Sequence, residues 1–334
     1  MIDQSKEQQL IAEMESILQE KMEKDYAQGE TKRDAHPKTL GLMQAKFRVM
    51  EDIPSQVSQV AGIFSTPGEY QAWVRFSNAS GSIQSDQKKD FRGIGIKLMG
   101  VEGERLNQDE KQTQDFLLMT YPIMPLGTVQ LFRDAVYYSI KKSPLLLVLK
   151  FLFGGHASIL KHLAQGKKHD TSPLDLNYWS TTPYRLGDTA VKYKLVPTST
   201  YRSALPSHLT SDYLRDNMKK HLQNAPATFD FMIQYFKDEQ TTPIEDAAIE
   251  WKEFDAPYIK VAELSIDPQD FCTARHEELS EALTFSPSNT LKANEPLGGI
   301  NRARITIYRN LSLFRHRRNG KKLYEPLPEN ITKD

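Results

Sequence analysis

The sequence predicts an α+β protein whose centre is an antiparallel sheet or barrel. Short β-rich runs, separated by turn clusters, fill residues 39–99, and no long helices alternate with them. Amphipathic or apolar helical patterns lie on both sides of this region. With 334 residues and 39% hydrophobic content, the chain is long and apolar enough to bury a sizeable core.

The N-terminal pattern, from about residue 5 to residue 27, predicts an amphipathic helix. Its apolar residues recur at helical spacing and are separated by charged residues: Leu10, Ile11, Met14, Ile17, Leu18 and Met22. Gly29 then ends the pattern. We expect this helix to pack on the domain or on a second subunit, so a homo-oligomer is one arrangement that the sequence allows.

Residues 44–49 and 70–76 predict strands, because β-branched and aromatic residues are frequent in both. The cluster Ser65-Thr66-Pro67-Gly68 supplies a turn between them. Further strands are expected at 190–196 and 260–265. Strands that follow one another through turns favour antiparallel pairing.

Residues 129–154 contain an apolar run from Pro144 to Phe153. This run is shorter than the roughly 20 residues of a membrane-spanning helix. The main interpretation is a buried or interfacial helix. The alternative is a peripheral membrane contact, favoured by the flanking residues Lys141, Lys142, Lys161, Lys167 and Lys168. Residues 206–237 predict another helical stretch, and the residues from about 319 predict a loose polar tail.

The composition excludes several classes of partner and site. Lysine plus arginine and aspartate plus glutamate both total 43, so no net charge favours nucleic acid. The single cysteine, Cys272, allows neither an intrachain disulfide nor a multi-cysteine metal site and is expected near the end of a strand. The N-terminus lacks the basic and apolar regions of a secretory signal, so we expect a cytoplasmic location.

Arg304 and Tyr308 are four residues apart and therefore share one face of a helix. A cation held beside a phenol favours its ionised form. Tyrosinate is a hard anionic ligand suited to ferric iron. A histidine from a distant part of the sequence could then serve the opposite side of the iron, since neutral imidazole suits proton transfer.

Several segments, in the same order along the chain, together resemble the haem-dependent catalase superfamily. They are Arg33 with His36-Pro37-Lys38-Thr39-Leu40-Gly41, Val74-Arg75-Phe76-Ser77, Asp90-Phe91-Arg92-Gly93-Ile94-Gly95-Ile96-Lys97, Phe285-Ser286-Pro287-Ser288-Asn289, and Arg304 to Tyr308 with Arg315. The resemblance covers about residues 30–318. It implies a haem domain at 30–318, which the predicted N-terminal helix at 1–29 precedes and the polar tail at 319–334 follows.

The resemblance implies an antiparallel β-barrel wrapped by helices, with haem b between the barrel and helical segments. Tyr308 would be the proximal iron ligand, and His36 the distal acid and base. The other implied site residues are Ser77, which steadies His36; Arg33, Arg75 and Arg315, which face the propionates; Gly93, which lets backbone lie against the porphyrin; and Arg304, which keeps Tyr308 ionised.

Departures from the family pattern refine the expected reaction. The distal asparagine has no clear counterpart, and Thr113 or Asp115 is the nearest candidate, with Thr113 taken as a catalytic residue. Ser312 replaces a histidine that follows the proximal tyrosine, and Ala35 precedes His36. These changes resemble the small catalase-related haem peroxidases.

The resulting hypothesis is an oxidoreductase of the oxidative stress response that reduces hydrogen peroxide or organic peroxides with an unidentified electron donor. Two alternatives belong to other functional classes. One is an isomerase or lyase of fatty-acid hydroperoxides, similar to the allene oxide synthases. The other is a non-catalytic haem-binding protein.

Overall fold

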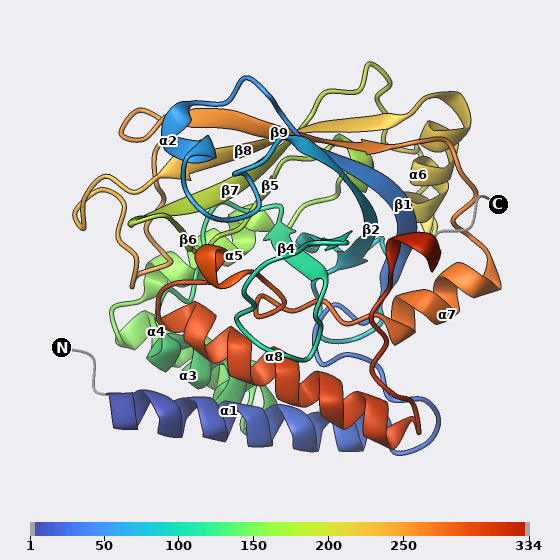
Figure 1. The fold of residues 1–334 in the computed structure, drawn as a ribbon. Coiled ribbons are helices and arrows are strands. Elements are labelled where there is room, and N and C mark those ends of the chain that lie inside the picture. The colour runs from blue at the N-terminus through green and yellow to red at the C-terminus, as the bar shows by residue number, and fades with distance from the viewer. Residues whose placement is uncertain (1–3, 331–334) are drawn as a thin grey trace.

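A computed structural model of the protein describes residues 4–330, and its centre is a closed antiparallel β-barrel (Figure 1). Eight strands within these residues pair in a ring, so the predicted fold class is confirmed. In ring order the strands are β5 (Tyr178–Trp179), β4 (Thr113–Met119), β3 (Arg92–Met99), β2 (Gly68–Asn78), β1 (Thr39–Val49), β9 (Tyr258–Ile266), β8 (Ala227–Tyr235) and β7 (Thr189–Pro197).

The short strand β5 closes the ring because it pairs with strands on both sides. Trp179 lies opposite Met119 of β4 and opposite Lys194 of β7. A ninth strand, β6 (Tyr184–Leu186), continues along the edge of β7 after a bend. Closure leaves the ring without a free edge at which another strand could add.

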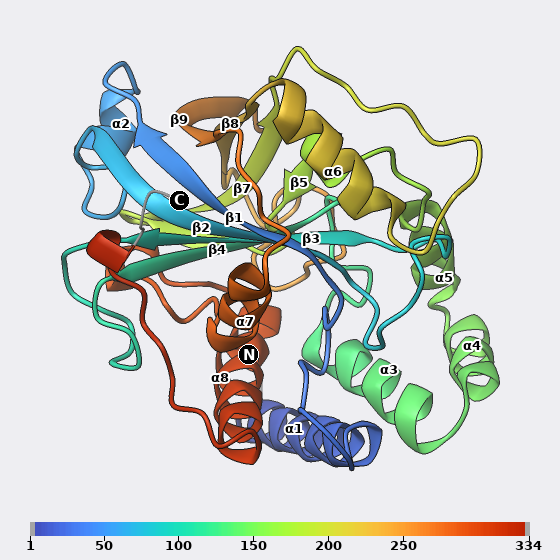
Figure 2. The same cartoon turned by 90° about the vertical axis from the view of Figure 1, so that its right-hand side faces the viewer.

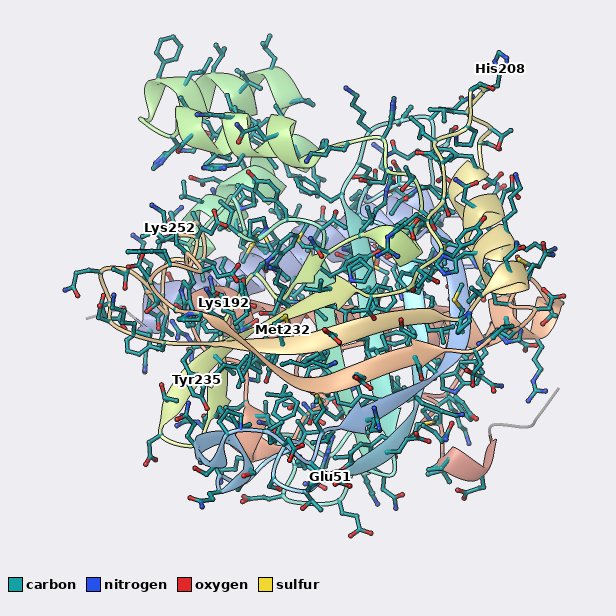
Figure 3. The ribbon with its side chains drawn as sticks, turned by 90° about the horizontal axis from the view of Figure 1, so that it is seen from above. Glu51, Lys192, His208, Met232, Tyr235 and Lys252 are labelled. Carbon is teal, nitrogen blue, oxygen red and sulfur yellow. The ribbon has the colours of Figure 1, made fainter. Side chains whose placement is uncertain are left out.

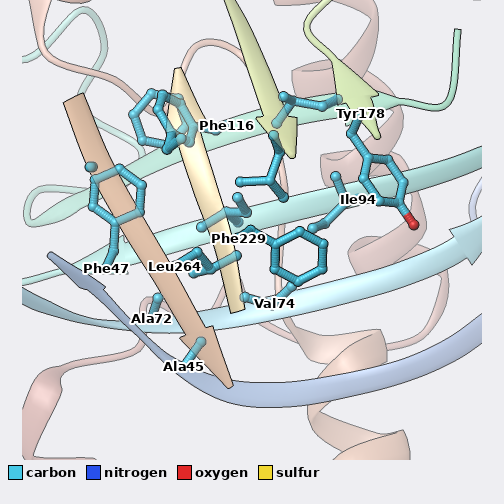
Figure 4. Close-up of a cluster of buried hydrophobic side chains, with 14 of the residues drawn as sticks. Ala45, Phe47, Ala72, Val74, Ile94, Phe116, Tyr178, Phe229 and Leu264 are labelled. Atoms are coloured by element: carbon cyan, nitrogen blue, oxygen red, sulfur yellow. The ribbon is translucent and has the colours of Figure 1, made fainter. Parts of the chain in front are cut away.

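Apolar side chains that alternate along the strands fill the inside of the barrel (Figure 4). Phe47, Phe116 and Phe231 are fully buried, and the Phe116 and Phe231 ring centroids lie 4.9 Å apart. The alternate residues of β2, β3 and β4 therefore point to the outer face of the barrel. This face carries Arg75, Ser77 and Gly93.

One predicted helix is wrong over half of its length. Helix α6 covers only Tyr213–Asn224, and the following residues form strand β8. After Pro226, buried residues alternate with half-buried ones along the strand. This period of two indicates a strand, and it outweighs the helical pattern that precedes it. The strands predicted at 44–49, 70–76, 190–196 and 260–265 are all present.

Helices α1, α3, α4 and α8 lie on one side of the barrel, and α2 and α6 lie towards the opposite side (Figures 1 and 2). The helices not yet given bounds are α1 (Gln4–Asp25), α2 (Ser55–Ser58), α3 (Val129–Lys141), α4 (Pro144–Phe153), α5 (Ala157–Gly166), α7 (Ala274–Ala282) and α8 (Gly299–Arg318). Short 3₁₀ turns occur at Pro173–Asp175, Lys292–Asn294 and Pro328–Asn330.

Helix α8 is held between the barrel and α1. Its residues Ala303, Ile307 and Leu311 form an apolar cluster with Met14 and Leu18 of the predicted N-terminal helix. Arg304, Tyr308 and Arg315 are spaced four and seven residues apart, so they share a different stripe of α8. Packing of one stripe on α1 thus fixes the direction of the other.

Helix α4 is not buried, so of the main interpretation only an interfacial helix stays a prediction. Phe151 is buried, whereas Leu145 is 68% exposed and Phe153 is 87% exposed. Within residues 4–330, no helix has the length and apolar character needed to cross a bilayer. The apolar run therefore forms an exposed surface.

The predicted loose tail is attached to the domain over residues 319–330. The Glu325 carboxylate accepts a hydrogen bond from the Lys111 backbone N–H at 2.6 Å. Asn319 exchanges hydrogen bonds with the backbone of Thr31 at 2.8 and 2.9 Å. Residues 331–334 of the tail, and residues 1–3 of the N-terminal segment, lie outside the described residues.

Candidate active site

His36 lies between α1 and β1 and has an unusual backbone conformation. Its φ is +57°, in the left-handed region, and Pro37 restricts the chain after it. The imidazole Nδ1 lies 2.9 Å from Ser77 Oγ, and the His36 carbonyl accepts a hydrogen bond from Arg75 at 2.8 Å. Strand β2 thus supports both the ring and the backbone of His36.

Gly93 lies directly against the His36 ring. A Cβ atom at this position would be 2.6 Å from Cε1 and 2.7 Å from Nδ1 of the imidazole. It would also lie 3.2 Å from Ser77 Oγ. The imidazole is therefore a close neighbour of Gly93, and the contact of Gly93 with a porphyrin stays a prediction.

The surroundings of His36 favour its neutral form. Burial, followed by the positive charges of Arg75, Arg304 and Arg33, lowers the pKa of His36 to about 3. A group with this pKa is an unprotonated base at neutral pH.

Three buried or half-buried arginines meet at the end of α7. Arg33 donates hydrogen bonds to the Ser280 and Leu283 carbonyls at 2.7 and 2.8 Å. Arg75 Nε donates to Ser280 Oγ at 3.2 Å. Arg315 donates to the Glu281 carbonyl. Thus Arg33, Arg75 and Arg315, from three distant parts of the sequence, surround one helix end.

This arginine cluster carries more positive than negative charge. The Glu281 carboxylate lies 3.5 Å from Arg33 and 3.8 Å from Arg315, and Arg75 has only neutral hydrogen-bond acceptors among its described contacts. Burial and then the charge of Arg33 lower the pKa of Arg315 to about 9, and the same two causes act on the pKa of Arg75. Buried cations in excess are stabilised by anions, so the cluster fits a ligand with carboxylates.

Arg304 and Tyr308 lie together on α8, as their spacing predicts. The guanidinium carbon of Arg304 is 5.3 Å from the centroid of the Tyr308 ring. Burial acts against the charged form of Arg304, but Tyr308 and Tyr184 outweigh it and raise the arginine pKa.

The bend between β5 and β6 positions Arg304. Thr181 at this bend has a φ of +60°, and Thr182 Oγ1 accepts a hydrogen bond from Arg304 at 3.1 Å. Asn301 Oδ1 accepts a second one at 3.1 Å. Among residues 4–330, Thr181 and His36 are the non-glycine residues with positive φ. Such conformations cluster at functional sites, and both of these lie beside the candidate site.

Thr113 does not lie beside His36. In the β3–β4 ladder Gly93 pairs with Met119, whereas Thr113 pairs with Met99. Six residues of strand, roughly 20 Å, therefore separate Thr113 from Gly93. The prediction that Thr113 assists His36 is wrong. The sequence around Thr113 does not reveal that Thr113 begins strand β4, whereas the end of β4 lies opposite Gly93.

Asp115, the other sequence candidate, has a structural partner instead. Its Oδ1 lies 2.8 Å from the buried Lys97 Nζ, and its Oδ2 accepts hydrogen bonds from the Ser286 backbone at 2.9 Å and from Asn289 at 3.1 Å. Burial raises the pKa of Asp115 to about 7, against the opposing charge of Lys97. Asp115 therefore fixes the turn at 285–289 to the barrel.

The sequence analysis missed Thr120, which follows β4 next to Gly93. Its Oγ1 accepts a hydrogen bond from the Arg92 backbone at 2.9 Å, and its own N–H donates to the Arg92 carbonyl at 3.0 Å. Met119, opposite Gly93, is apolar.

Solved structures of known proteins share this architecture. A fungal catalase matches with a TM-score of 0.67 and 15% identity over 94% of this chain and 68% of its own. Catalase A from Saccharomyces cerevisiae matches with 0.68 and 14% identity, over 93% and 69%. A bacterial catalase matches with 0.65 and 16% identity, over 93% and 63%.

The closed antiparallel barrel with helices packed around it defines the fold class of this chain. The fold of this chain is the catalase fold. The chain spans about two thirds of the length of these catalases. No protein-family model and no curated protein sequence matches it.

Proposed function

We propose that this protein is a haem-dependent peroxidase that reduces hydrogen peroxide or organic peroxides. The arginine cluster is the observation that carries the proposal. Arg33 and Arg315 both lie beside the Glu281 carboxylate, and Arg75 forms no ion pair within residues 4–330, so a ligand with two carboxylates would balance the cluster. Haem b has two propionates and also takes tyrosine as an iron ligand.

Tyr308 would hold the iron, and Arg304 would keep its phenolic oxygen ionised. Haem, when bound, supplies the redox chemistry that splits the peroxide bond. The chain supplies the proton transfer. His36 Nδ1 is occupied by Ser77, so Nε2 is the nitrogen that accepts a proton from one peroxide oxygen and delivers it to the other.

The balanced reaction consumes one peroxide, two protons and two electrons from an external donor, and yields water and, from an organic peroxide, an alcohol. A catalase instead uses a second peroxide as the donor, which must be held and oriented beside the histidine. Thr120 offers a hydroxyl that already accepts a backbone hydrogen bond, and Met119 offers none. This arrangement favours an organic donor.

We therefore expect the haem-loaded protein to oxidise an added dye faster than it releases oxygen from hydrogen peroxide. Oxygen-electrode and dye-oxidation assays on one preparation measure both rates. Rapid oxygen release with negligible dye oxidation would identify a true catalase and contradict the proposal. Rearranged products from a fatty-acid hydroperoxide would indicate the isomerase alternative.

Replacing Gly93 with alanine tests whether the position of His36 controls the reaction. The added Cβ would overlap the imidazole, so we expect Gly93→Ala to lower peroxide turnover by about 100-fold, as expected for a small misplacement of a catalytic group. Gly68→Ala is the matched control, since nothing lies within 4 Å of its Cβ position. Circular dichroism should show both variants folded. Equal turnover of the two variants would refute the role of Gly93.

A further inference from the structure

The α4 region, defined as residues 141–169, concentrates the exposed apolar surface of the protein. Six large apolar residues with substantial exposure lie within ten positions: Leu145, Leu146, Val148, Leu149, Leu152 and Phe153. Elsewhere in residues 4–330 such residues are scattered through loops and termini. A concentrated exposed apolar patch marks an interaction site more often than scattered single residues do.

Local sequence makes this exposed helix a fixed structure. Ser143 Oγ accepts a hydrogen bond from the Leu146 backbone at 3.2 Å, Pro144 occupies the first turn, and Gly154 follows the last residue. Phe151 is fully buried and anchors the helix. Leu145, Leu149 and Leu152 then recur at helical spacing on an exposed side.

Figures 2 and 3 show this region at the edge of the molecule. Helix α4 lies beyond α3 and α5, and in the view from above the green helices stand away from the barrel with side chains directed outwards. The apolar side of α4 is therefore accessible to a large, flat partner.

The charge of the region selects the kind of partner. Residues 135–169 contain six lysines and three histidines but no aspartate or glutamate, although the whole chain has a formal net charge of zero. Lys141 pairs with Glu20, and Lys150 lies 3.2 Å from Asp134. Lys142, Lys161 and Lys167 are exposed and form no ion pair within residues 4–330.

We propose that the α4 region docks the protein on the surface of an anionic membrane. An apolar helix flanked by lysines can lie in the interface, with its leucines below the headgroups and its lysines beside anionic lipids. The helix is too short to cross the bilayer, so the contact would be peripheral. This docking is independent of haem and of the proposed peroxidase reaction.

The docking surface is joined firmly to the candidate site. Tyr121 OH lies 2.8 Å from His162 Nδ1 of α5, and Gly166 is packed so closely on Phe91 that a Cβ would lie 2.0 Å from the Phe91 ring. Tyr121 follows Thr120, and Phe91 precedes Arg92 and Gly93 in the sequence. One layer of side chains therefore connects the α4 region to the strand ends beside His36.

Vesicle flotation of the full chain tests the proposal. We expect binding to vesicles of phosphatidylcholine with roughly 30% phosphatidylserine, and little binding to phosphatidylcholine alone. The double variant Leu152→Ser and Phe153→Ser should lose at least about tenfold in partitioning, because its apolar contact is removed. Lys142→Glu with Lys161→Glu and Lys167→Glu should lose a similar factor and remove the salt sensitivity.

Phe254→Ser is the matched control, since Phe254 is 96% exposed and lies outside the α4 region. It should bind vesicles as the original chain does. Equal binding by all variants, or no binding to the anionic vesicles, would overturn the proposal. So would a concentration-dependent dimer that Leu152→Ser and Phe153→Ser dissociates, because a second copy of the chain would then cover the helix.

Discussion

Tyr308→Phe is expected to leave the protein nearly free of haem after purification. The substitution removes one oxygen atom and keeps the ring, so the packing of α8 on α1 should be unchanged. The removed oxygen atom is the proposed iron ligand itself. Changes to groups that only support a ligand cost about 10–100-fold in metal affinity, so we expect a loss of at least this size.

The absorption spectrum of purified protein measures this effect, as the ratio of haem to protein absorbance. Tyr235→Phe is the matched control, because Tyr235 lies on β8 (Figure 3) and its hydroxyl makes only a 3.5 Å contact with the Gln56 carbonyl. The control should keep full haem. If Tyr308→Phe also keeps full haem with an unchanged ferric spectrum, Tyr308 is not the ligand.

His36→Ala is expected to bind haem but to react with peroxide about 10²–10⁴-fold more slowly, the range typical of a general acid–base group. Stopped-flow absorption would follow the reaction with peroxide, and haem content would be measured separately. His208→Ala is the matched control, since His208 is exposed in a loop at the edge of the molecule (Figure 3) and makes none of the contacts described for the site. A normal rate in His36→Ala would contradict the assignment.

The pH dependence follows from the lowered pKa of His36, which is about 3. The base is neutral above this value and is lost only when pH falls towards it. We therefore expect the His36-dependent rate to stay level from neutral pH down to about pH 4 and to fall below that. A rate that falls near pH 6.5, the ordinary histidine value, would show that His36 is not held in this environment.

The same shift affects stability in a defined direction. The unfolded chain takes up a proton on His36 near pH 6.5, whereas the folded chain does so near pH 3. The folded state therefore loses stability as pH falls through this interval. Denaturant unfolding of the haem-free protein should show a smaller pH dependence in His36→Ala than in the original chain.

Local patterns were enough to predict much of the fold. Turn clusters and β-rich runs indicated an antiparallel sheet or barrel, and the spacing of Arg304 and Tyr308 placed both on one helix face. These features depend on residues close together in sequence, where backbone geometry determines which side chains are neighbours. The helix predicted for residues 225–237 is wrong because a helical pattern and a strand pattern adjoin there. Only the pairing of β8 with β7 and β9 shows where the strand begins.

Contacts across the fold required the tertiary structure. Arg33, Arg75 and Arg315 can be singled out from the sequence only by resemblance, and their convergence on Ser280 and Glu281 depends on how α7 meets the barrel. The contact of Gly93 with His36 likewise joins residues that are 57 positions apart in the sequence. No local period encodes such distances.

The sequence by itself determined the strand and helix periods, the Arg304–Tyr308 pair and the charge of the α4 region, because each is a property of neighbouring residues. The tertiary structure alone decided that Thr113 is distant from His36, that Thr120 pairs with the Arg92 backbone, and that α4 is exposed. Strand register and burial arise from long-range packing. A shift of a few residues in pairing moves a side chain from one end of the barrel to the other without altering any local pattern.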